Sequence, residues 1–138
     1  MFEKFPNAVV NVQRIVALEI FDNPHKKKPA TYSVYAVVKV HTYFSDIDIA
    51  GDFTSEESAR EYIKQTVQSY GLNLEIFPSG NAIDVKCIGA CFVNKYHNGK
   101  EEVVADIGQY SEIKIADGNN FPAFLNMLNG VKENDRKD

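Results

Sequence analysis

The sequence predicts an α+β fold in which mainly antiparallel strands form the sheet or sheets and two helices pack on them. Three observations lead to this fold class. Apolar and polar residues alternate over several short stretches, which is the period of half-buried strands. Two other stretches have helical spacing and residues suited to capping at their ends. The connections between strands are too short for repeated parallel crossovers.

Three strands are expected before the first helix. Residues 9–21 carry apolar side chains on one parity, and Arg14 breaks that parity, which predicts a bulge or an edge there. Residues 32–43 are apolar on both parities, so this strand is expected in the interior of a sheet. Ile47 and Ile49 alternate with aspartates in a third, half-exposed strand.

The first helix is expected over residues 55–70. Thr54 is the predicted N-cap, and Glu57 three residues later completes a capping box. Apolar side chains recur at helical spacing along this segment, and Gly71 supplies a left-handed stop. Such a helix places one apolar stripe on the sheet.

The second half of the chain repeats this order. Its expected elements are a strand at 83–93, a turn at 97–100, strands at 103–107 and 111–116, and a short helix at about 121–129. Asn119 or Asn120 is the predicted cap of that helix, and Gly130 is its predicted stop.

The two halves also resemble each other in their letters. Phe5-Pro6 recurs as Phe77-Pro78, residues 10–17 align with 83–90, and residues 44–50 align with 110–116. We interpret this as a degenerate tandem β-β-β-α repeat, with pseudo-repeats at about 5–71 and 77–130 inside a single domain of residues 1–131. The alternative is a chance likeness among amphipathic strands. Residues 132–138 are polar and are expected to form a disordered tail.

Composition excludes several classes of protein. The 138 residues are 44% hydrophobic and 25% charged, as in ordinary globular chains. A net charge of -4 argues against general nucleic-acid binding, which needs a basic face. No apolar run is long enough to span a membrane, and the N-terminus lacks the pattern of a signal peptide. Two cysteines are too few for a disulfide scaffold, so a cytoplasmic location is expected.

No motif of a known catalytic or metal site occurs. Cys87 and Cys91 on one strand would lie about 13 Å apart, too far for a shared zinc ion or a disulfide. The chain has no nucleophile elbow, zinc-protease motif or phosphate loop. We therefore expect no catalytic residues, metal or cofactor. A small hydrolase or transferase that uses His97 or His41 is kept as an alternative.

Two groups of residues are candidates for contact with a ligand or partner. The first combines a basic loop with aromatic side chains: His25, Lys26, Lys27, Lys28, Tyr35, His41 and Tyr43. Lysines can dock a phosphate or an acidic partner, and tyrosines can stack on a base. The second is an acidic docking surface formed by Asp46, Asp48, Asp52 and Glu56.

The expected function is non-enzymatic binding to a protein partner. Small size, acidic charge and the lack of a catalytic motif are typical of phage and mobile-element accessory proteins, so an inhibitor of a bacterial defence system is one candidate. A small anionic, nucleotide-like ligand held at a subunit interface is the alternative. Apolar residues on both parities of residues 32–43, around Tyr35, Val37 and Tyr43, predict an exposed patch in a monomer and hence a homo-oligomer. The alternative is a monomer in which the two half-sheets pack on each other as a sandwich.

Overall fold

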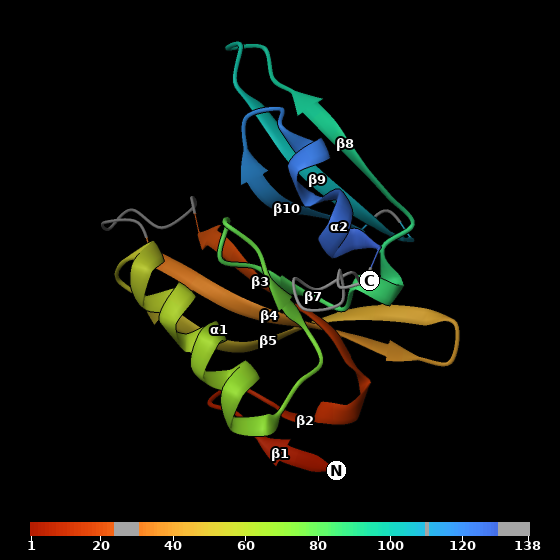
Figure 1. Ribbon diagram of the computed structural model, residues 1–138. Coiled ribbons are helices and arrows are strands. Elements are labelled where there is room, and N and C mark those ends of the chain that lie inside the picture. Colours follow the sequence, from red (N-terminus) through yellow and green to blue (C-terminus); the bar gives the residue numbers. More distant parts are fainter. Residues whose placement is uncertain (24–30, 110, 130–138) are drawn as a thin grey trace. The chain divides into compact units, whose positions relative to one another are not determined.

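The computed structural model describes residues 1–23, 31–109 and 111–129, and its fold is α+β with mostly antiparallel sheets, as the sequence predicts (Figure 1). The chain divides into two compact units, Met1–Asp84 and Val85–Asp138. Each unit has its own antiparallel sheet and its own helical segments.

The first unit contains a five-stranded sheet and a separate two-stranded hairpin. In sheet order the five strands are β5 (Tyr43–Phe53), β4 (Thr31–Val40), β3 (Ile15–Asn23), β7 (Ala82–Ile83) and β6 (Glu75–Ile76). The hairpin consists of β1 (Phe2–Lys4) and β2 (Val9–Asn11). β4 lies between β5 and β3, the interior position that its two apolar parities predict.

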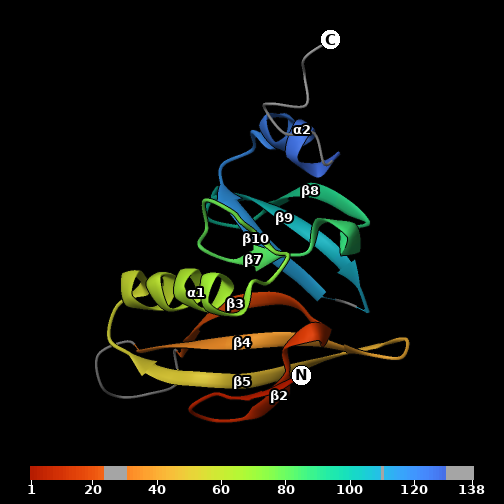
Figure 2. The same ribbon diagram turned by 60° about the horizontal axis from the view of Figure 1, so that its bottom comes forward.

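One helix, α1 (Glu56–Tyr70), packs on β3, β4 and β5 (Figures 1 and 2). Its N-cap is Ser55, whose hydroxyl accepts a hydrogen bond of 3.1 Å from the amide three residues later. The predicted cap at Thr54 is therefore wrong by one residue, because the chain takes one more extended residue before it turns into the helix. Gly71 ends the helix at φ 59°, which confirms the predicted left-handed stop.

The core of the first unit joins its hairpin, sheet and helix. Its fully or almost fully buried side chains include Phe5, Val10, Leu18, Val34, Ile49, Ile63 and Ala82. The Phe5 ring also contacts the Tyr70 ring, with centroids 5.5 Å apart. The hairpin is thus held to the end of α1 by apolar burial as well as by its own hydrogen bonds.

The second unit contains a three-stranded antiparallel sheet. Its elements are the 3-10 turn η2 (Val85–Cys87), the strands β8 (Ala90–Lys95), β9 (Glu101–Gly108) and β10 (Ser111–Asp117), the 3-10 turn η3 (Phe121–Phe124) and the short helix α2 (Leu125–Leu128). The sheet order is β10-β9-β8. The predicted turn at 97–100 joins β8 to β9, and Gly99 adopts φ 84° there. Asn120 is the N-cap residue of η3, although its side chain forms no capping hydrogen bond.

Two strands that the sequence predicts as continuous are interrupted. The segment 9–21 is divided into β2, the 3-10 turn η1 (Val12–Arg14) and β3. The segment 83–93 is divided in the same way into β7, η2 and β8. A single 3-10 turn can be accommodated without disturbing the run of apolar residues, so alternation alone did not reveal it. Arg14, which predicted a bulge or an edge, is the last residue of η1.

The strand predicted over residues 32–43 ends earlier, at Val40. His41 and Thr42 form a two-residue turn between paired Val40 and Tyr43, and His41 adopts φ 56°. Tyr43 belongs to the next strand, so it does not continue the face of β4. The positive φ at a non-glycine residue is what the apolar pattern could not show.

The hairpins β1–β2 and β6–β7 have the same register at aligned residues. In β1–β2, Glu3 pairs with Val10 and Lys4 with Val9. In β6–β7, Glu75 pairs with Ile83 and Ile76 with Ala82, which are the aligned residues. Each hairpin encloses a Phe-Pro pair and is followed by a 3-10 turn of three residues, directly after β2 and after one further residue, Asp84, in the case of β7.

The strands that follow also share their irregularities. The pairing of β5 with β4 skips Ile49, and the pairing of β10 with β9 skips Ile115, the residue aligned with Ile49. The turn before β5 has a non-glycine residue at positive φ, His41, and the turn before β10 has Gln109 at φ 54°. Bulges are specific features of a fold. The two halves of the chain therefore share the order of their strands, the register of their hairpins and the positions of their bulges.

We expect Asn81→Ala to destabilise the first unit by about 1–3 kcal/mol, because it removes a hydrogen-bond acceptor from a buried site. The Asn81 side-chain oxygen accepts a bond of 2.8 Å from the Ile20 amide, which extends the pairing of β7 with β3. Urea unfolding measures the loss. Asn7→Ala, in the other hairpin turn, removes only an exposed bond from Asn7 to Asp48 and serves as the control. Equal losses in both variants would contradict this account.

Candidate functional site

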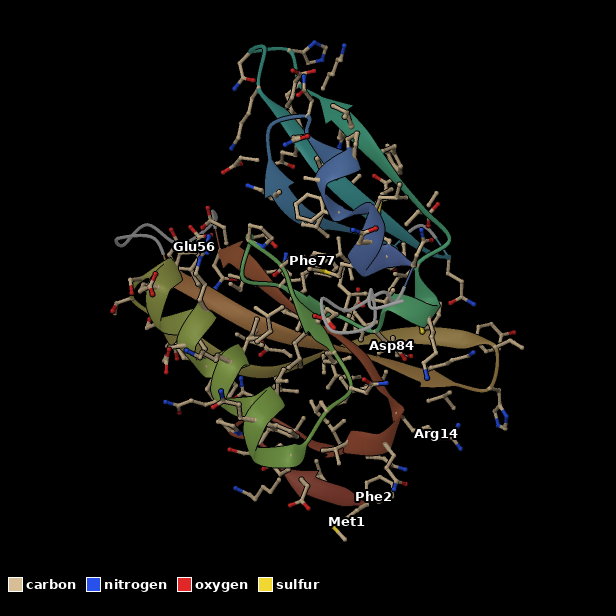
Figure 3. The ribbon with its side chains drawn as sticks, viewed as in Figure 1. Met1, Phe2, Arg14, Glu56, Phe77 and Asp84 are labelled. Atoms are coloured by element: carbon tan, nitrogen blue, oxygen red, sulfur yellow. The ribbon has the colours of Figure 1, made fainter. Side chains whose placement is uncertain are left out.

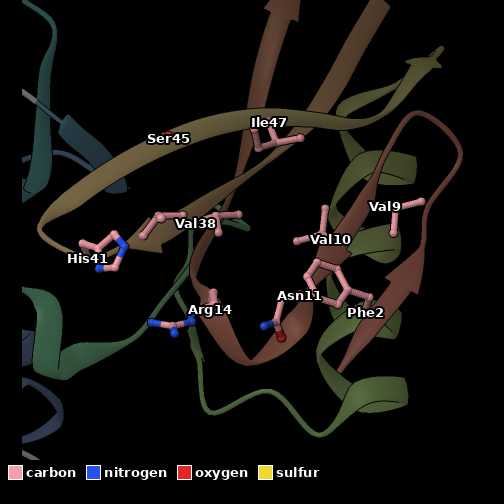
Figure 4. A pocket seen from close by; sticks show the side chains of 10 residues that line it. Phe2, Val9, Val10, Asn11, Arg14, Val38, His41, Ser45 and Ile47 are labelled. Atoms are coloured by element: carbon pink, nitrogen blue, oxygen red, sulfur yellow. The ribbon is translucent and has the colours of Figure 1, made fainter.

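A pocket of about 400 Å³ lies within the first unit, between the hairpin β1–β2 and the strands β4 and β5 (Figure 4). Its apolar lining consists of Phe2, Val9, Val10, Val38, Val40 and Ile47, and its polar lining of Asn11, Arg14, His41 and Ser45. Pockets that bind small ligands have volumes of roughly 300–1,000 Å³ and mostly apolar walls. The size and the lining of this pocket are therefore those of a binding site.

One wall of the pocket is the outer edge of β2. In the described ranges, β2 pairs with β1 alone, so its other edge carries backbone groups without a strand partner. β2 is short because Asn11 caps η1: its side-chain oxygen accepts hydrogen bonds from the Gln13 amide at 3.2 Å and from the N-terminal amine at 3.0 Å. The edge of β2 and the pocket beside it are thus one surface.

The charged lining of the pocket is basic. Arg14 and His41 are the lining residues whose side chains can be cationic, and no lining residue is acidic. The planar guanidinium of Arg14 can bond a carboxylate or phosphate in a bidentate manner. The pocket can therefore hold an apolar group and accommodate an anionic group at its rim.

The structure separates the three aromatic and histidine residues that the sequence grouped. His41 lines the pocket, whereas Tyr35 on β4 is half-buried and stacks edge-on against Phe21 at a centroid distance of 4.7 Å. Tyr43 on β5 is 69% exposed. Val37 is only 1% exposed, so the exposed patch expected around Tyr35, Val37 and Tyr43 is wrong. The homo-oligomer inferred from it stays a prediction that needs another basis.

The predicted basic cluster, His25 to Lys28, lies outside the described residues, as does the predicted tail at 132–138.

The four acids of the predicted docking surface lie along β5 and at the start of α1, and none of them lines the pocket. Asp48 accepts a hydrogen bond of 3.1 Å from the Asn7 side chain. Glu56, labelled in Figure 3, pairs with Arg60 at 3.4 Å one helical turn away. Asp52 is exposed and adopts φ 62°. Exposed ion pairs of this kind contribute little to stability.

Asp46 acts on a half-buried carboxyl group that the sequence did not single out. Burial, and after it the negative charge of Asp46, together raise the pKa of Glu19 on β3 from 4.5 to about 8. Glu19 pairs with Tyr35 in the register of β3 and β4. At neutral pH the Glu19 carboxyl is therefore mostly protonated.

The two cysteines occupy different elements. Cys87 belongs to η2 and Cys91 to β8, and both side chains are half-buried. Burial raises the pKa of the Cys91 thiol. Among the residues whose positions are described, no group of three or more histidine, cysteine or acidic side chains is arranged to hold a metal ion. His97 lies in the exposed turn between β8 and β9.

Of the ten residues that line the pocket, the sequence had pointed to His41 alone as a contact residue, and the other nine were missed. Two of the missed residues, Phe2 and Val9, are 68% and 64% exposed, which is unusual for apolar residues that flank a core hairpin. When the alignment of the halves is extended, Phe2 pairs with Leu74, which packs partly buried against the core of the first unit, and Val9 pairs with Ala82, which belongs to that core.

Comparisons with known proteins identify no relative. No family model, curated protein or solved structure matches this chain significantly. No described helix has both the length and the apolar composition that a bilayer crossing requires. The pocket and the strand edges therefore carry the functional argument.

We expect the stability of the protein to fall as pH rises from about 4.5 to 8 and then to level off, because of Glu19. Between these values the folded state keeps a proton that the unfolded state has lost, so each further rise in pH favours unfolding. Glu19→Gln removes this dependence, so between pH 5 and pH 9 its free energy of unfolding rises relative to that of the native chain by about 3–4 kcal/mol. Urea unfolding at several pH values measures it.

The control for this prediction is Glu61→Gln, which changes an exposed carboxyl on α1. It should keep the pH dependence of the native chain. An unchanged slope in Glu19→Gln would show that Glu19 is ionised in the folded state.

Proposed function

We propose that this protein works by binding and that its recognition surface is the pocket beside β2. The observation that carries the proposal is the coincidence of an apolar pocket of about 400 Å³ with an unpaired strand edge, within the described part of the chain. A strand edge supplies regularly spaced amides and carbonyls, and an adjacent pocket accepts side chains. This combination suits an extended apolar segment of a protein partner.

The exposed lining residues support a protein partner. Phe2, Val9 and Val40 are all large apolar side chains with roughly half or more of their surface in solvent. Burial of apolar surface of this kind stabilises a complex, by about 25 cal/mol per Å² before the costs of association. The net charge of -4 favours a basic partner, of which a nucleic-acid enzyme of a bacterial defence system is one class.

A small anionic ligand is the second candidate, because Arg14 and His41 both line the pocket. In this case the apolar wall holds a ring and the two basic side chains hold its negative group. A catalytic role for His41 would need a nucleophile or a bound water within hydrogen-bonding distance of the substrate, and we propose no such step.

A neutral fluorescent probe, N-phenyl-1-naphthylamine, tests the pocket directly. We expect the native protein to bind it with enhanced fluorescence, and Val40→Glu to weaken binding about tenfold or more, because a carboxylate in the apolar wall is costly to desolvate. Val40 is 48% exposed, so this substitution leaves the core intact. Fluorescence titration measures the dissociation constant.

Ile76→Glu is the matched control, because Ile76 is an exposed apolar residue of the same unit outside the pocket. Equal weakening in both variants, or no binding at all, would contradict the proposal. The anionic analogue 8-anilinonaphthalene-1-sulfonate separates the two candidates. Stronger binding of this probe that is lost in Arg14→Ala would favour the anionic ligand, whereas equal binding of both probes favours an apolar protein segment.

A further inference from the structure

The pairing of β7 with β3 shows how one hairpin of this chain docks on a sheet. Ile83 pairs with Ala17, Ala82 pairs with Leu18, and the Asp84 amide donates a hydrogen bond of 2.8 Å to the Val16 carbonyl. The hairpin β6–β7 precedes the second set of three strands in the sequence, yet it extends the sheet of the first set.

The hairpin β1–β2 has the same construction, but its outer edge is open. Val9 and Asn11 are the aligned counterparts of Ala82 and Asp84. Hydrogen bonds from the Val12 amide to Met1 and from the Phe5 amide to Ala8 fix which residues of β2 face β1. Backbone groups alternate in direction along a strand, so the amides and carbonyls of Val9 and Asn11 point away from β1, to the open edge of β2. In the second hairpin, the amides and carbonyls of the counterparts Ala82 and Asp84 point away from β6 in the same way, and there they meet β3.

The counterpart of β3 in the second half is β8, and its outer edge is also open. In the alignment, Ala90 and Cys91 take the places of Ala17 and Leu18. β8 pairs only with β9 among the described strands. The amide of Tyr96 bonds to Lys100 across the β8–β9 turn, so the alternation along β8 directs the backbone groups of Cys91 away from β9.

The residues of the paired edges are buried, whereas their counterparts on the open edges are more exposed. Ala82, which pairs with β3, is 0% exposed and belongs to the core, and Leu74 packs partly buried against that core. Their counterparts on the first hairpin, Phe2 and Val9, are among the most exposed large apolar side chains (Figure 3 shows Phe2). On the acceptor side, Ala17 and Leu18 are fully buried, whereas Ala90 is exposed and Cys91 half-buried. A donor edge and an acceptor edge are thus both uncovered.

We propose that the chain assembles head to tail: β2 of one copy adds to β8 of a second copy as β7 adds to β3. Val9 then lies opposite the second copy's Cys91, and Val10 opposite its Ala90. The Asn11 amide donates to the carbonyl of Gly89, the counterpart of Val16. This deepens the proposed function and rests on it, since the edge of β2 is a wall of the pocket. The partner at this edge is another copy of this chain, which carries the same net charge of -4, so strand pairing and apolar burial select it and the basic partner that net charge favours does not bind here.

The contact is heterologous, because the donor and the acceptor are different surfaces. Each copy offers one open β2 edge and one open β8 edge. Two copies can therefore form a closed dimer in which each β2 pairs with the other copy's β8, and a larger number of copies can form a ring or an open chain. Ala8 stands where the second hairpin has Asn81, which bonds to Ile20. The contact between copies therefore has one hydrogen bond fewer than its internal model, which is consistent with reversible assembly.

A disulfide between copies tests the register. Paired residues of antiparallel strands have Cα atoms about 4.5–5.5 Å apart, within the range that a disulfide requires. In a Cys87→Ser background, Val9→Cys should cross-link to Cys91 of another copy when diamide accepts the two electrons and two protons of the thiols. Lys4→Cys is the matched control, because Lys4 pairs with Val9 but lies one strand further from the proposed edge.

We expect most of the Val9→Cys protein to migrate as a covalent dimer or larger species on a non-reducing gel, and Lys4→Cys to remain at 15.5 kDa. Removal of Cys91 by Cys91→Ser should abolish the product. Light scattering of the native chain should show a mass above 15.5 kDa, which either rises with protein concentration or equals a fixed multiple of the 15.5 kDa chain mass. Val9→Lys should restore the monomer, whereas Ile76→Lys should not.

A constant mass of 15.5 kDa at all concentrations, with no more cross-linking in Val9→Cys than in Lys4→Cys, would overturn the head-to-tail contact. The probe titration separates this failure from a failure of the proposed function. Probe binding that depends on Val40 in a protein that stays monomeric would leave the pocket as a binding site for another partner. Absence of probe binding and of assembly together would overturn both.

Discussion

The fold of the first unit depends on how the edge of β3 is satisfied. A strand with one unpaired edge exposes a row of amides and carbonyls, and burying them without partners is costly. β3 avoids this because β7, more than 60 residues later in the sequence, supplies two paired residues and the Asn81 side chain. Leu18, Ala82 and Leu74 join one core for the same reason. The five-stranded sheet is therefore completed by a hairpin from outside its first three strands.

Much of the architecture could be predicted from the sequence, because it follows from local patterns. Alternation revealed the strands, and the stop at Gly71 revealed the end of α1. Local patterns failed where a short irregular element interrupted a strand without changing its apolar content. The turns η1 and η2 and the positive φ of His41 are such places. The turn η1 separates β2 from β3, and the turn η2 separates β7 from β8. Because alternation did not reveal these boundaries, it could not reveal the pairing of β7 with β3.

The candidate site was harder to predict because it depends on the absence, among the described strands, of a partner at the outer edge of β2. Of the residues proposed from the sequence, His41 lines the pocket, whereas the tyrosines and acids of the described chain do not. Chemical character drew attention to lysines, tyrosines and aspartates. Six of the ten lining residues are apolar, among them Phe2, Val9 and Val40, which are ordinary apolar residues in sequence. For Phe2 and Val9, only comparison with Leu74 and Ala82, their less exposed counterparts, makes their exposure informative.

An open strand edge is usually a hazard, because an extended edge can pair with any other strand in several registers. The edge of β2 is limited to Val9–Asn11, since Asn11 turns the chain into η1 immediately afterwards. On β8 the lysine at position 95 closes the far end, and a charged side chain discourages continued pairing there. The edge of β2 ends at the cap residue Asn11, and the edge of β8 ends at the charged Lys95. Because both edges are short and have defined ends, they can pair in few registers. The same 3-10 turn that hides the strand boundary from sequence analysis therefore gives this edge its specificity.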